Sequence, residues 1–328
     1  MSRMRGITLA LAGDTMLGRS VAEALRTASP GSLVSPDLAD LTRSADLFVL
    51  NLECCISDRG EPWPDPGKPF FFRAPPGAVE LLTYLGTDAA TLANNHALDY
   101  GPQALLDTLE HLQGSGIAVV GAGADEAGAR GFAMLQAPGG FRLALLGLTD
   151  HPADFAAGPD APGVGFAELR ADGLPVWLTS GIEEARSRAD AVLVTPHWGP
   201  NMAAEPVPHV RRAANALIRA GATLVAGHSA HVFQGVWDRV LFDVGDFIDD
   251  YAVDPALRND LGVLFLVTLD REGPLRIEAV PLALDFCFTR IATGDDASWI
   301  GRRLHRACAA FGTDVVEEDG RFVVTYRR

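Results

Sequence analysis

Ile7-Thr-Leu-Ala-Leu-Ala-Gly-Asp14 decides the fold, because an apolar run of strand length ends there on a glycine and a carboxylate. Polar groups likewise follow short apolar runs at Asn51-Leu52-Glu53, Asn94-Asn95-His96, His197-Trp198-Gly199, Gly227-His228, His231 and Gly245-Asp246. A strand that ends in a loop places its last side chain at the carboxyl edge of a sheet, where open α/β folds build their sites. The pattern therefore predicts an α/β fold in which these polar groups share one edge.

Apolar runs of β type alternate with helical patterns along the chain. The predicted strands are Ile7–Ala12, Leu47–Leu52, Ala89–Leu92, Ala118–Val120, Arg142–Leu148, Ala191–Pro196, Thr223–Ala226, Val240–Val244, Val263–Leu269 and Arg276–Pro281. The predicted helices are Ser20–Arg26, Gly77–Leu85, Pro102–Gln113, Gly181–Ala189, Pro208–Ala220 and Ala297–Phe311. So many strands favour two stacked sheets over one. The Pro- and Gly-rich stretches Ser57–Pro76 and Pro152–Gly165 are predicted to be loops that cover the site edge.

Composition limits the class of protein. The chain has 328 residues, of which 48% are hydrophobic, enough for a large core. No repeat or composition shift divides it, so we predict a single domain over residues 1–328. A formal net charge of -15 argues against nucleic acid or an acidic membrane surface as partner. The apolar stretch near Met1 is too short for a secretory signal and no run has the length of a membrane span, so we expect a soluble, cytoplasmic protein with reduced cysteines.

Two strand ends supply carboxylates. Asp14, taken alone, is either a helix cap or a metal ligand. In Asn51-Leu52-Glu53 the first and third side chains share one face of an extended segment. This placement suits Glu53 as a bridging carboxylate that Asn51 supports, with a buried structural Asn–Glu pair as the alternative.

Asn94-Asn95-His96 crowds two amides and an imidazole into one turn. An amide oxygen is a hard ligand suited to the same cations as a carboxylate, and an adjacent imidazole can donate a proton to a leaving oxygen. A hydrogen-bonded turn without a ligand is the alternative. Asp99 follows at the distance of a helix cap, and its functional alternative is to orient His96.

Three further histidines follow apolar runs. His197 ends a predicted strand, where a lone histidine is usually a satisfied core residue. His228 and His231 lie in one tight loop, and their spacing can direct two imidazoles at one metal ion or at neighbouring ions. Asp246 competes with nearby carboxylates for any role. The histidines without such company are predicted to be structural, namely His111, His151, His209 and His305.

A pair of divalent cations would account for these groups together. Two cations held close together would bind a phosphoryl-like oxygen and lower the pKa of a bridging water, which predicts a metal-dependent hydrolase. The cofactors expected are two ions of Mn, Zn, Fe or Mg. The candidate substrate contacts are Arg19, Lys68, Arg73, Asn51 and Asp246. The three cationic residues among them can form charge-assisted contacts with a small anionic or glutamyl-containing substrate, and surface solvation is their alternative explanation.

Seven motifs together resemble one known family. They are Gly-Asp-Thr-Met-Leu-Gly at 13–18, Asn-Leu-Glu at 51–53, Lys-Pro-Phe-Phe-Phe-Arg-Ala-Pro-Pro at 68–76, Asn-Asn-His-Ala-Leu-Asp-Tyr-Gly at 94–101, His-Trp-Gly-Pro-Asn at 197–201, Gly-His-Ser-Ala-His-Val at 227–232 and Gly-Asp-Phe at 245–247. The sequence is similar to the CapA family of poly-gamma-glutamate capsule biosynthesis proteins, with the motifs in the family's order.

The resemblance implies a fold and a set of ligands. The CapA family looks like a branch of the calcineurin-like metallophosphoesterases, whose fold is a four-layer αββα sandwich with two stacked mixed β-sheets and a dinuclear centre at one edge. The motif core would span residues 7–285, and residues 286–328 would add a helix and strands. By resemblance, the metal ligands are Asp14, Glu53, Asn95, His197, His228 and His231. His96 would be the proton donor or a phosphate contact, with Asp99 beside it.

Three departures from the family patterns stand out. The closing metallophosphoesterase motif separates its histidines by one residue, and many CapA relatives read His-Pro-His there, whereas two residues separate His228 from His231, so the resemblance supports His231 more strongly than His228. The metallophosphoesterase motif begins Asp-x-His, whereas Met16 stands two residues after Asp14 here, so one ligand of the first metal is missing. Asp246 stands where relatives often carry asparagine.

Three functions are expected from these features. The first is a soluble metal-dependent hydrolase of phosphoesterase type. The second is an enzyme that hydrolyses or ligates a gamma-glutamyl amide in polyglutamate metabolism. The third is a non-catalytic accessory protein that binds an anionic polymer during capsule biosynthesis.

Overall fold

The computed structural model describes residues 6–171 and 173–326. Its helices are α1 (Arg19–Thr27), α2 (Pro36–Ser44), α3 (Val79–Tyr84), α4 (Gly101–Gly114), α5 (Glu126–Arg130), α6 (Val176–Arg188), α7 (Pro208–Ala220) and α8 (Gly294–Ala309). Its strands are β1 (Ile7–Thr15), β2 (Leu47–Leu52), β3 (Cys55–Ile56), β4 (Arg73–Ala74), β5 (Ala89–Thr91), β6 (Ala118–Val120), β7 (Ala122–Gly123), β8 (Ala133–Gln136), β9 (Arg142–Thr149), β10 (Gly163–Val164), β11 (Ala191–His197), β12 (Leu224–Ala226), β13 (Val236–Trp237), β14 (Val240–Leu241), β15 (Asp246–Ile248), β16 (Leu261–Asp270), β17 (Gly273–Asp285), β18 (Phe288–Ile291), β19 (Val316–Glu318) and β20 (Arg321–Thr325).

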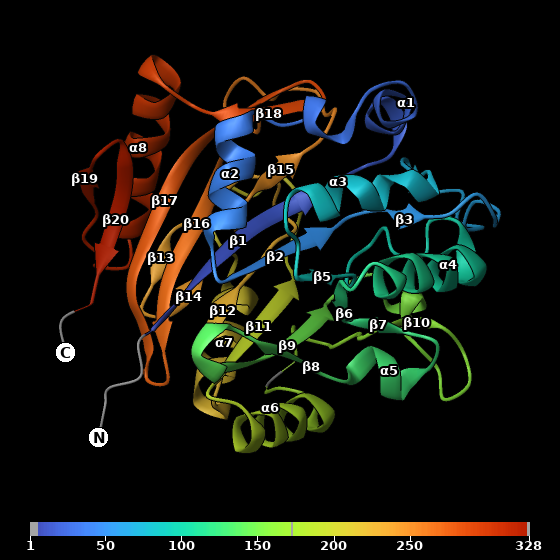
Figure 1. The fold of residues 1–328 in the computed structure, drawn as a ribbon. Helices are drawn as coiled ribbons and strands as arrows, with labels where there is room; N and C mark the ends of the chain where they lie inside the picture. Colours follow the sequence, from blue (N-terminus) through green and yellow to red (C-terminus); the bar gives the residue numbers. More distant parts are fainter. Residues whose placement is uncertain (1–5, 172, 327–328) are drawn as a thin grey trace.

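The larger sheet is mixed and has the order β19-β20-β17-β16-β1-β2-β5-β6, with β15 paired to β1 and β18 paired to β17 (Figure 1). β1, β2, β5 and β6 run parallel, whereas β16 pairs antiparallel with both β1 and β17. The carboxyl ends of β1, β2 and β5 therefore meet at one edge. Asp14, Glu53 and Asn95 lie at or just beyond these ends.

The second large sheet is also mixed, with the order β13-β14-β12-β11-β9-β8. Its central strands β9, β11, β12 and β14 run parallel, and β8 and β13 pair antiparallel at its two edges. His197 is the last residue of β11, and His228 lies two residues beyond β12. Two-stranded sheets, β3 with β4 and β7 with β10, complete the pairing.

Alternation along the strands divides the buried side chains into three clusters. On β1, Ala10 and Ala12 pack with residues of α2, α3 and α4, whereas Leu9 and Leu11 pack with residues of the second sheet such as Leu193. This two-residue period follows from the pleat, which points successive side chains to opposite faces. A third cluster joins the far face of the second sheet to α6 and α7. Figure 1 shows α1–α3 at the top and α6 at the bottom, with strands of both sheets between them.

The chain crosses from one sheet to the other immediately before Asp246. Only Val240–Leu241 is a strand, shorter than the predicted Val240–Val244. The Asp243 carboxylate accepts hydrogen bonds from the backbone N–H groups of Ala230 and Gly245, both at 2.8 Å, and so turns the chain. β15 then pairs in parallel with β1, with Asp246 opposite Asp14.

The α/β class with several mixed sheets is confirmed. Each predicted strand and helix is present, with some displaced ends. The largest error concerns α6, which begins at Val176 after Pro175 and not at Gly181. α2 and α5 were not predicted, although Pro36 begins α2 and the Asp125 carboxylate caps α5 by accepting a hydrogen bond from Gly128 N. None of the described helices combines the length and the apolar character that a membrane span requires.

The chain segments that contain Gly13 and Gly245 approach each other closely at the site edge. A Cβ atom on Gly13 would lie 1.7 Å from the carbonyl oxygen of Gly245, which accepts a hydrogen bond from Asp14 N at 2.9 Å. We expect Gly13→Ala to lower the free energy of unfolding by about 3 kcal/mol or more, because backbone must shift. Urea denaturation followed by circular dichroism measures this. Gly114→Ala, where a Cβ meets nothing within 4 Å, is the control and should be neutral or slightly stabilising. Equal midpoints for the two variants would contradict the prediction.

Candidate metal centre

Asp14 is fully buried and is held from three directions. Its Oδ1 accepts a hydrogen bond from Asn51 Nδ2 at 2.7 Å, and its Oδ2 accepts one from Ser229 N at 3.3 Å. His231 Nδ1 lies 3.2 Å from the same Oδ2. Asp14 therefore connects the end of β1 to the loop that follows β12. No helix cap is formed by its side chain, because Gly18 is the residue that precedes α1.

Glu53 lies between two of the histidines. Its Oε1 is 3.8 Å from His197 Nε2, and its Oε2 is 3.9 Å from His231 Nδ1. Tyr251 donates its hydroxyl hydrogen to Oε2 at 3.2 Å. The carboxylate is therefore placed to join two groups of donors.

The polar side chains in the turn after β5 have two roles. Asn94 stabilises the turn, whereas Asn95 and His96 belong to the candidate site. Asn94 supports the turn, because its Nδ2 donates to Asn51 Oδ1 at 3.0 Å and its Oδ1 accepts from His96 N at 3.0 Å. Asn95 Oδ1 is buried with no hydrogen-bond partner among the described residues. His96 Nδ1 lies 2.7 Å from Asp99 Oδ2. Asp99 thus orients His96, and its interpretation as a helix cap is wrong, since no side chain caps α4.

The histidines from the second sheet complete two groups of donors. His197 Nδ1 and His228 Nδ1 are 2.8 Å apart. Asp14, His197 and His228 offer ligand atoms that all lie within 4.8 Å of one another, and so do Asp14, His231 and Asp246. Ligands 2.0–2.2 Å from a cation are at most about 4.4 Å apart, so each group has close to the spacing that one cation requires.

Several buried polar atoms at this edge have no hydrogen-bond partner among the described residues. They are Glu53 Oε1, Asn95 Oδ1, His197 Nε2, His228 Nε2 and Asp246 Oδ2. Buried polar atoms are nearly always satisfied, because an unsatisfied one costs about 1–3 kcal/mol. Their shared chemistry is that of oxygen and imidazole donors to a divalent cation. The residues therefore fit a metal centre.

Met16, two residues after Asp14, offers no ligand of the kind found in the two donor groups. The Met16 side chain is fully buried in the apolar core, and its sulfur accepts a hydrogen bond from Gly18 N at 3.0 Å. Asp246, opposite Asp14 on β15, instead places Oδ1 2.9 Å from His231 Nδ1. Asp246 thus belongs to one of the two candidate donor groups, whereas the sequence grouped it with the substrate contacts.

Asp14 and His231 form a buried pair of opposite charge. Burial alone would raise the pKa of Asp14, but hydrogen bonding and charge attraction from His231 outweigh it, and the pKa is lowered. Burial alone would lower the pKa of His231, but Asp246, Glu53 and Asp14 raise it well above its ordinary value. A proton on His231 therefore compensates the buried negative charge in the absence of a cation.

The other donors are shifted towards their neutral forms. Burial, together with the charge of Asp14, raises the pKa of Glu53 well above its ordinary value, and burial does the same for Asp246. Burial lowers the pKa of His228 to about 4 and that of His197 well below its ordinary value. Neutral imidazoles are the form that binds a cation, whereas the carboxylic acids must lose protons on binding.

The three cationic residues that were predicted to contact the substrate lie in different surroundings. Arg19 pairs with Asp250, with Nη2 2.8 Å from Oδ1. Lys68 Nζ lies 3.0 Å from Asp99 Oδ1 and donates to the Asn95 carbonyl oxygen at 2.7 Å, so it supports the turn that carries His96. Arg73 stacks over the ring of Tyr100 at 4.1 Å. Arg73, Lys68 and the buried Asn51 do not line the pocket beside the site.

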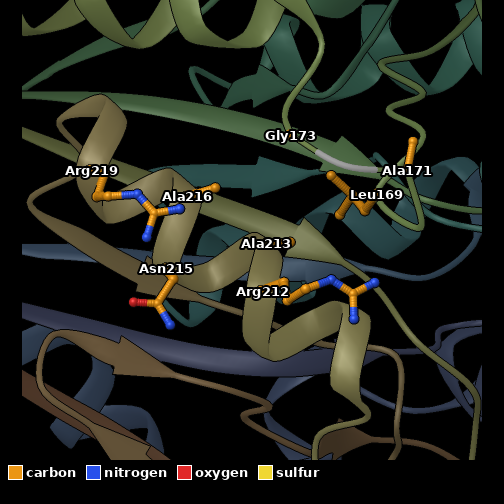
Figure 2. Close-up of a pocket in the computed structure, with 8 residues that line it drawn as sticks. All are labelled: Leu169, Ala171, Gly173, Arg212, Ala213, Asn215, Ala216 and Arg219. Carbon is orange, nitrogen blue, oxygen red and sulfur yellow. The ribbon is translucent and has the colours of Figure 1, made fainter.

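That pocket has a volume of about 350 Å³ and adjoins the candidate metal donors. It is lined by Arg19, Phe70, Phe72, His96, Asn201, Met202, His231, Tyr251, Ala252 and Asn259. A separate pocket of about 320 Å³ lies between α7 and the segment that precedes α6 (Figure 2). Its lining residues are Leu169, Ala171, Gly173, Arg212, Ala213, Asn215, Ala216 and Arg219. These residues offer neither a carboxylate nor an imidazole to a metal ion.

Two histidines that were predicted to lack polar company are close to the site. The ring of His151 is 5.3 Å from that of His197, and its Nδ1 is 2.5 Å from Asp150 Oδ1. His209 Nε2 lies 3.0 Å from Asp150 Oδ2, which also accepts a hydrogen bond from Gly199 N at 3.2 Å. Asp150 and His151 directly follow β9, so the strand-end pattern could have found them. His209 lies in α7 and carries no such signal.

The two predicted loops meet beside the site. Trp63 of the first loop donates from Nε1 to Asp154 Oδ2 of the second at 3.1 Å, and its ring is 4.9 Å from that of Phe155. Lys68 lies over the same Phe155 ring at 5.4 Å. Short strands occur in both loops, β4 in the first and β10 in the second.

Comparison with known proteins agrees with the motifs. A family model described as "Bacterial capsule synthesis protein PGA_cap" matches residues 8–251. The chain is 29% identical over 359 residues to a probable polyglutamine synthesis accessory protein of Mycobacterium tuberculosis, covering 94% of this chain and 93% of that protein. It is 28% identical to the PGA biosynthesis protein CapA of Bacillus subtilis, covering 84% of this chain and 71% of that protein. The crystal structure of TT1561 of Thermus thermophilus aligns with a TM-score of 0.40 and 13% identity, covering 81% of this chain and 95% of that chain.

Asp249 makes the free energy of unfolding of the metal-free protein depend on pH. Burial raises its pKa from 3.8 to about 6. Between these values the folded state binds more protons than the unfolded state, so this carboxyl lowers the free energy of unfolding as pH rises. Asp249→Asn removes the effect. We expect the variant's stability relative to wild type to increase by roughly 1–3 kcal/mol from about pH 4 to about pH 6.

Chemical denaturation across that pH range, after treatment with a chelator, measures the difference. Asp238→Asn, which removes a carboxylate at an exposed position, is the control. A flat difference for Asp249→Asn would contradict the raised pKa.

Proposed function

The chain belongs to the bacterial capsule synthesis protein PGA_cap family, as its motifs predicted, and from this premise we propose that it is a metal-dependent phosphoesterase with two divalent cations. The observation that carries the proposal is the convergence of buried, unpartnered oxygen and nitrogen atoms from β2, β5, β11, β12 and β15 at one edge. A purely structural role for these atoms would leave several desolvation costs uncompensated.

We assign the donors to two cations. Asp14, His231 and Asp246 would hold the first, with Asp246 in place of the histidine that the metallophosphoesterase motif carries where Met16 stands here. His197 and His228, which also lie close to Asp14, would hold the second, with Asn95 added because its buried Oδ1 has no partner among the described residues and with Glu53 between the two groups. Mixed oxygen and imidazole ligands suit Mn, Fe or Zn, and a largely oxygen-bound site also suits Mg.

When bound, the cations would supply an activated water and stabilise the attacking and leaving oxygens. His96 is our proton donor to the leaving oxygen, because it lines the pocket while Asp99 fixes its Nδ1. Asp99 is itself fixed, since its Oδ2 accepts a hydrogen bond from Phe72 N at 2.6 Å and its Oδ1 faces Lys68. Glu53 keeps its orientation through Tyr251.

The relatives support a second candidate. The Mycobacterium tuberculosis protein is named a polyglutamine synthesis accessory protein, and the Bacillus subtilis protein a PGA biosynthesis protein. These names favour a role on glutamyl chains, either as an enzyme of gamma-glutamyl amides or as a binding protein without turnover. Release of phosphate from phosphoesters, against cleavage or binding of gamma-glutamyl peptides without phosphate release, distinguishes the candidates.

The proposed fold is the four-layer αββα sandwich of the metallophosphoesterases, formed by one domain. Three buried clusters support it, because they lie between helices and the first sheet, between the two sheets, and between the second sheet and helices. The C-terminal β20 pairs with β17, and α8 packs on the cluster between the sheets. The C-terminal extension would therefore belong to the same unit.

Asp246 tests the ligand assignment. Titration of Mn²⁺ into chelator-treated protein should give two sites and release protons, because carboxyls with raised pKa must ionise. We expect Asp246→Ala, which removes the ligand oxygen, to weaken one site by more than the roughly 10–100-fold that follows loss of an outer-shell partner. Isothermal calorimetry in buffers of different ionisation enthalpy measures both quantities. Asp238→Ala is the control, and an unchanged Asp246→Ala titration would remove Asp246 from the ligand set.

His96 tests the chemistry separately from metal binding. We expect His96→Gln to lower kcat for phosphate release by about 10²–10⁴-fold, the usual effect of losing a general acid, with metal content unchanged. Asp99→Asn should lower it less, since His96 remains but loses its fixed orientation. His111→Gln, in α4, serves as the control. Full turnover by His96→Gln would show that another group protonates the leaving oxygen.

A further inference from the structure

The pocket of about 350 Å³ adjoins both the proposed proton donor and one proposed metal ligand. His96 and His231 line it, so a group attached to the reacting centre would extend into this space. The chemistry of the remaining walls therefore indicates which substrates fit.

One wall is an aromatic surface that extends from solvent to His96. The rings of Phe70 and Phe72 are nearly parallel, with centroids 6.4 Å apart, and Phe72 stacks on His96 at 4.1 Å. Tyr251 lies 5.8 Å from Phe72. Phe70 is 54% exposed, although contact of an aromatic ring with water is unfavourable. An exposed aromatic ring at the rim of a pocket is typical of a ligand contact.

The pocket is also lined by a methionine that is held in an unfavourable backbone conformation. Met202 is 38% exposed and has a φ of 56°, and its N–H donates to Ala230 O at 3.0 Å. Arg19 and His231, which also line the pocket, have φ values of 49° and 58°. Non-glycine residues in this region cost free energy and cluster at functional sites. Methionine packs adaptably against flat apolar groups.

The charge of the pocket is balanced internally. Arg19 is its cationic residue, and Nη2 lies 2.8 Å from the buried carboxylate of Asp250. The guanidinium carbon also lies 5.6–5.8 Å from the ring centres of Phe70, Phe72 and Tyr251. No described lysine or arginine without a carboxylate partner lines this space. A polymer with a negative charge on every repeat would find no matching row of cations here.

We propose, on the basis of the proposed phosphoesterase function, that the pocket binds the organic group of a phosphomonoester and that this group is flat and apolar, such as an aryl ring. The ring would contact Phe70, Phe72 and Met202, which line this space. Hydrolysis forms a bond from the water oxygen to phosphorus and breaks the bond from phosphorus to the ester oxygen. One water proton ends on the departing alcohol, and the hydroxyl stays on phosphate.

Two esters with similar leaving groups test this selectivity, 2-phenylethyl phosphate and ethyl phosphate. We expect the Mn²⁺-loaded full-length protein to prefer the phenyl ester by at least about tenfold in kcat/KM. Phe70→Ala and Met202→Ala should each raise KM for the phenyl ester about 5–10-fold, a larger increase than for the ethyl ester, because the phenyl ring would contact both side chains. Met134→Ala is the matched control, since Met134 is also 38% exposed but lies on β8 outside the pocket.

Equal use of the two esters by the wild type, or equal losses for both in Phe70→Ala, would overturn the proposal. Competitive inhibition by poly-gamma-glutamate that disappears in Phe70→Ala would also overturn it. Turnover of neither ester would instead count against the proposed function. In that case the affinities for 2-phenylethylphosphonate and ethylphosphonate, measured by calorimetry, test the pocket without turnover. Tighter binding of the phenyl compound by the wild type, lost in Phe70→Ala, would support the proposal. Equal affinities of the wild type for the two compounds would reject it.

Discussion

Burial of Asp14 beside His231 is the constraint on which the rest of the site depends. A carboxylate removed from water must be compensated by hydrogen bonds and opposite charge. Asn51 and Ser229 supply the hydrogen bonds, and His231 supplies the charge when it is protonated. Burial and the charge of Asp14 raise the pKa of Glu53, because the attraction of His231 offsets them only in part. A divalent cation would satisfy this cluster better than a proton can, which links the stability of the edge to its proposed chemistry.

Each of the two large sheets supplies a different type of donor to this edge. The first sheet supplies the oxygen donors at the ends of β1, β2 and β5, and the second supplies imidazoles at the ends of β11 and β12. The turn at Asp243 joins them, since it holds Ala230 and Gly245 with one carboxylate and directs Asp246 back beside Asp14. The backbone of Gly245 lies so close to Gly13 that a side chain at position 13 would obstruct this path. The site is therefore a consequence of how the sheets are joined.

The strand-end pattern predicted Asp14, Glu53 and His197 because each position depends only on where a local apolar run stops. Asp246 was grouped with substrate contacts because its partner is set by the pairing of β15 with β1, which no local period reveals. Lys68 and Arg73 lie in a long loop whose path depends on tertiary contacts, so their partners, Asp99 and Tyr100, could not be predicted from spacing. His151 was missed although Asp150-His151 follows a strand as the other motifs do.

Charge ultimately limits what the site can attract. The chain carries a formal net charge of -15, and its cations nearest the centre, Lys68 and Arg19, each face a buried carboxylate. An anionic substrate would therefore approach an acidic surface with little unpaired positive charge in the pocket. The proposed cations would reverse that local potential at one point only, the place where the reacting group would lie. Under the proposed function, this arrangement would select for a substrate whose charge is concentrated in a single group, and the aromatic wall of Phe70 and Phe72 would recognise the remainder.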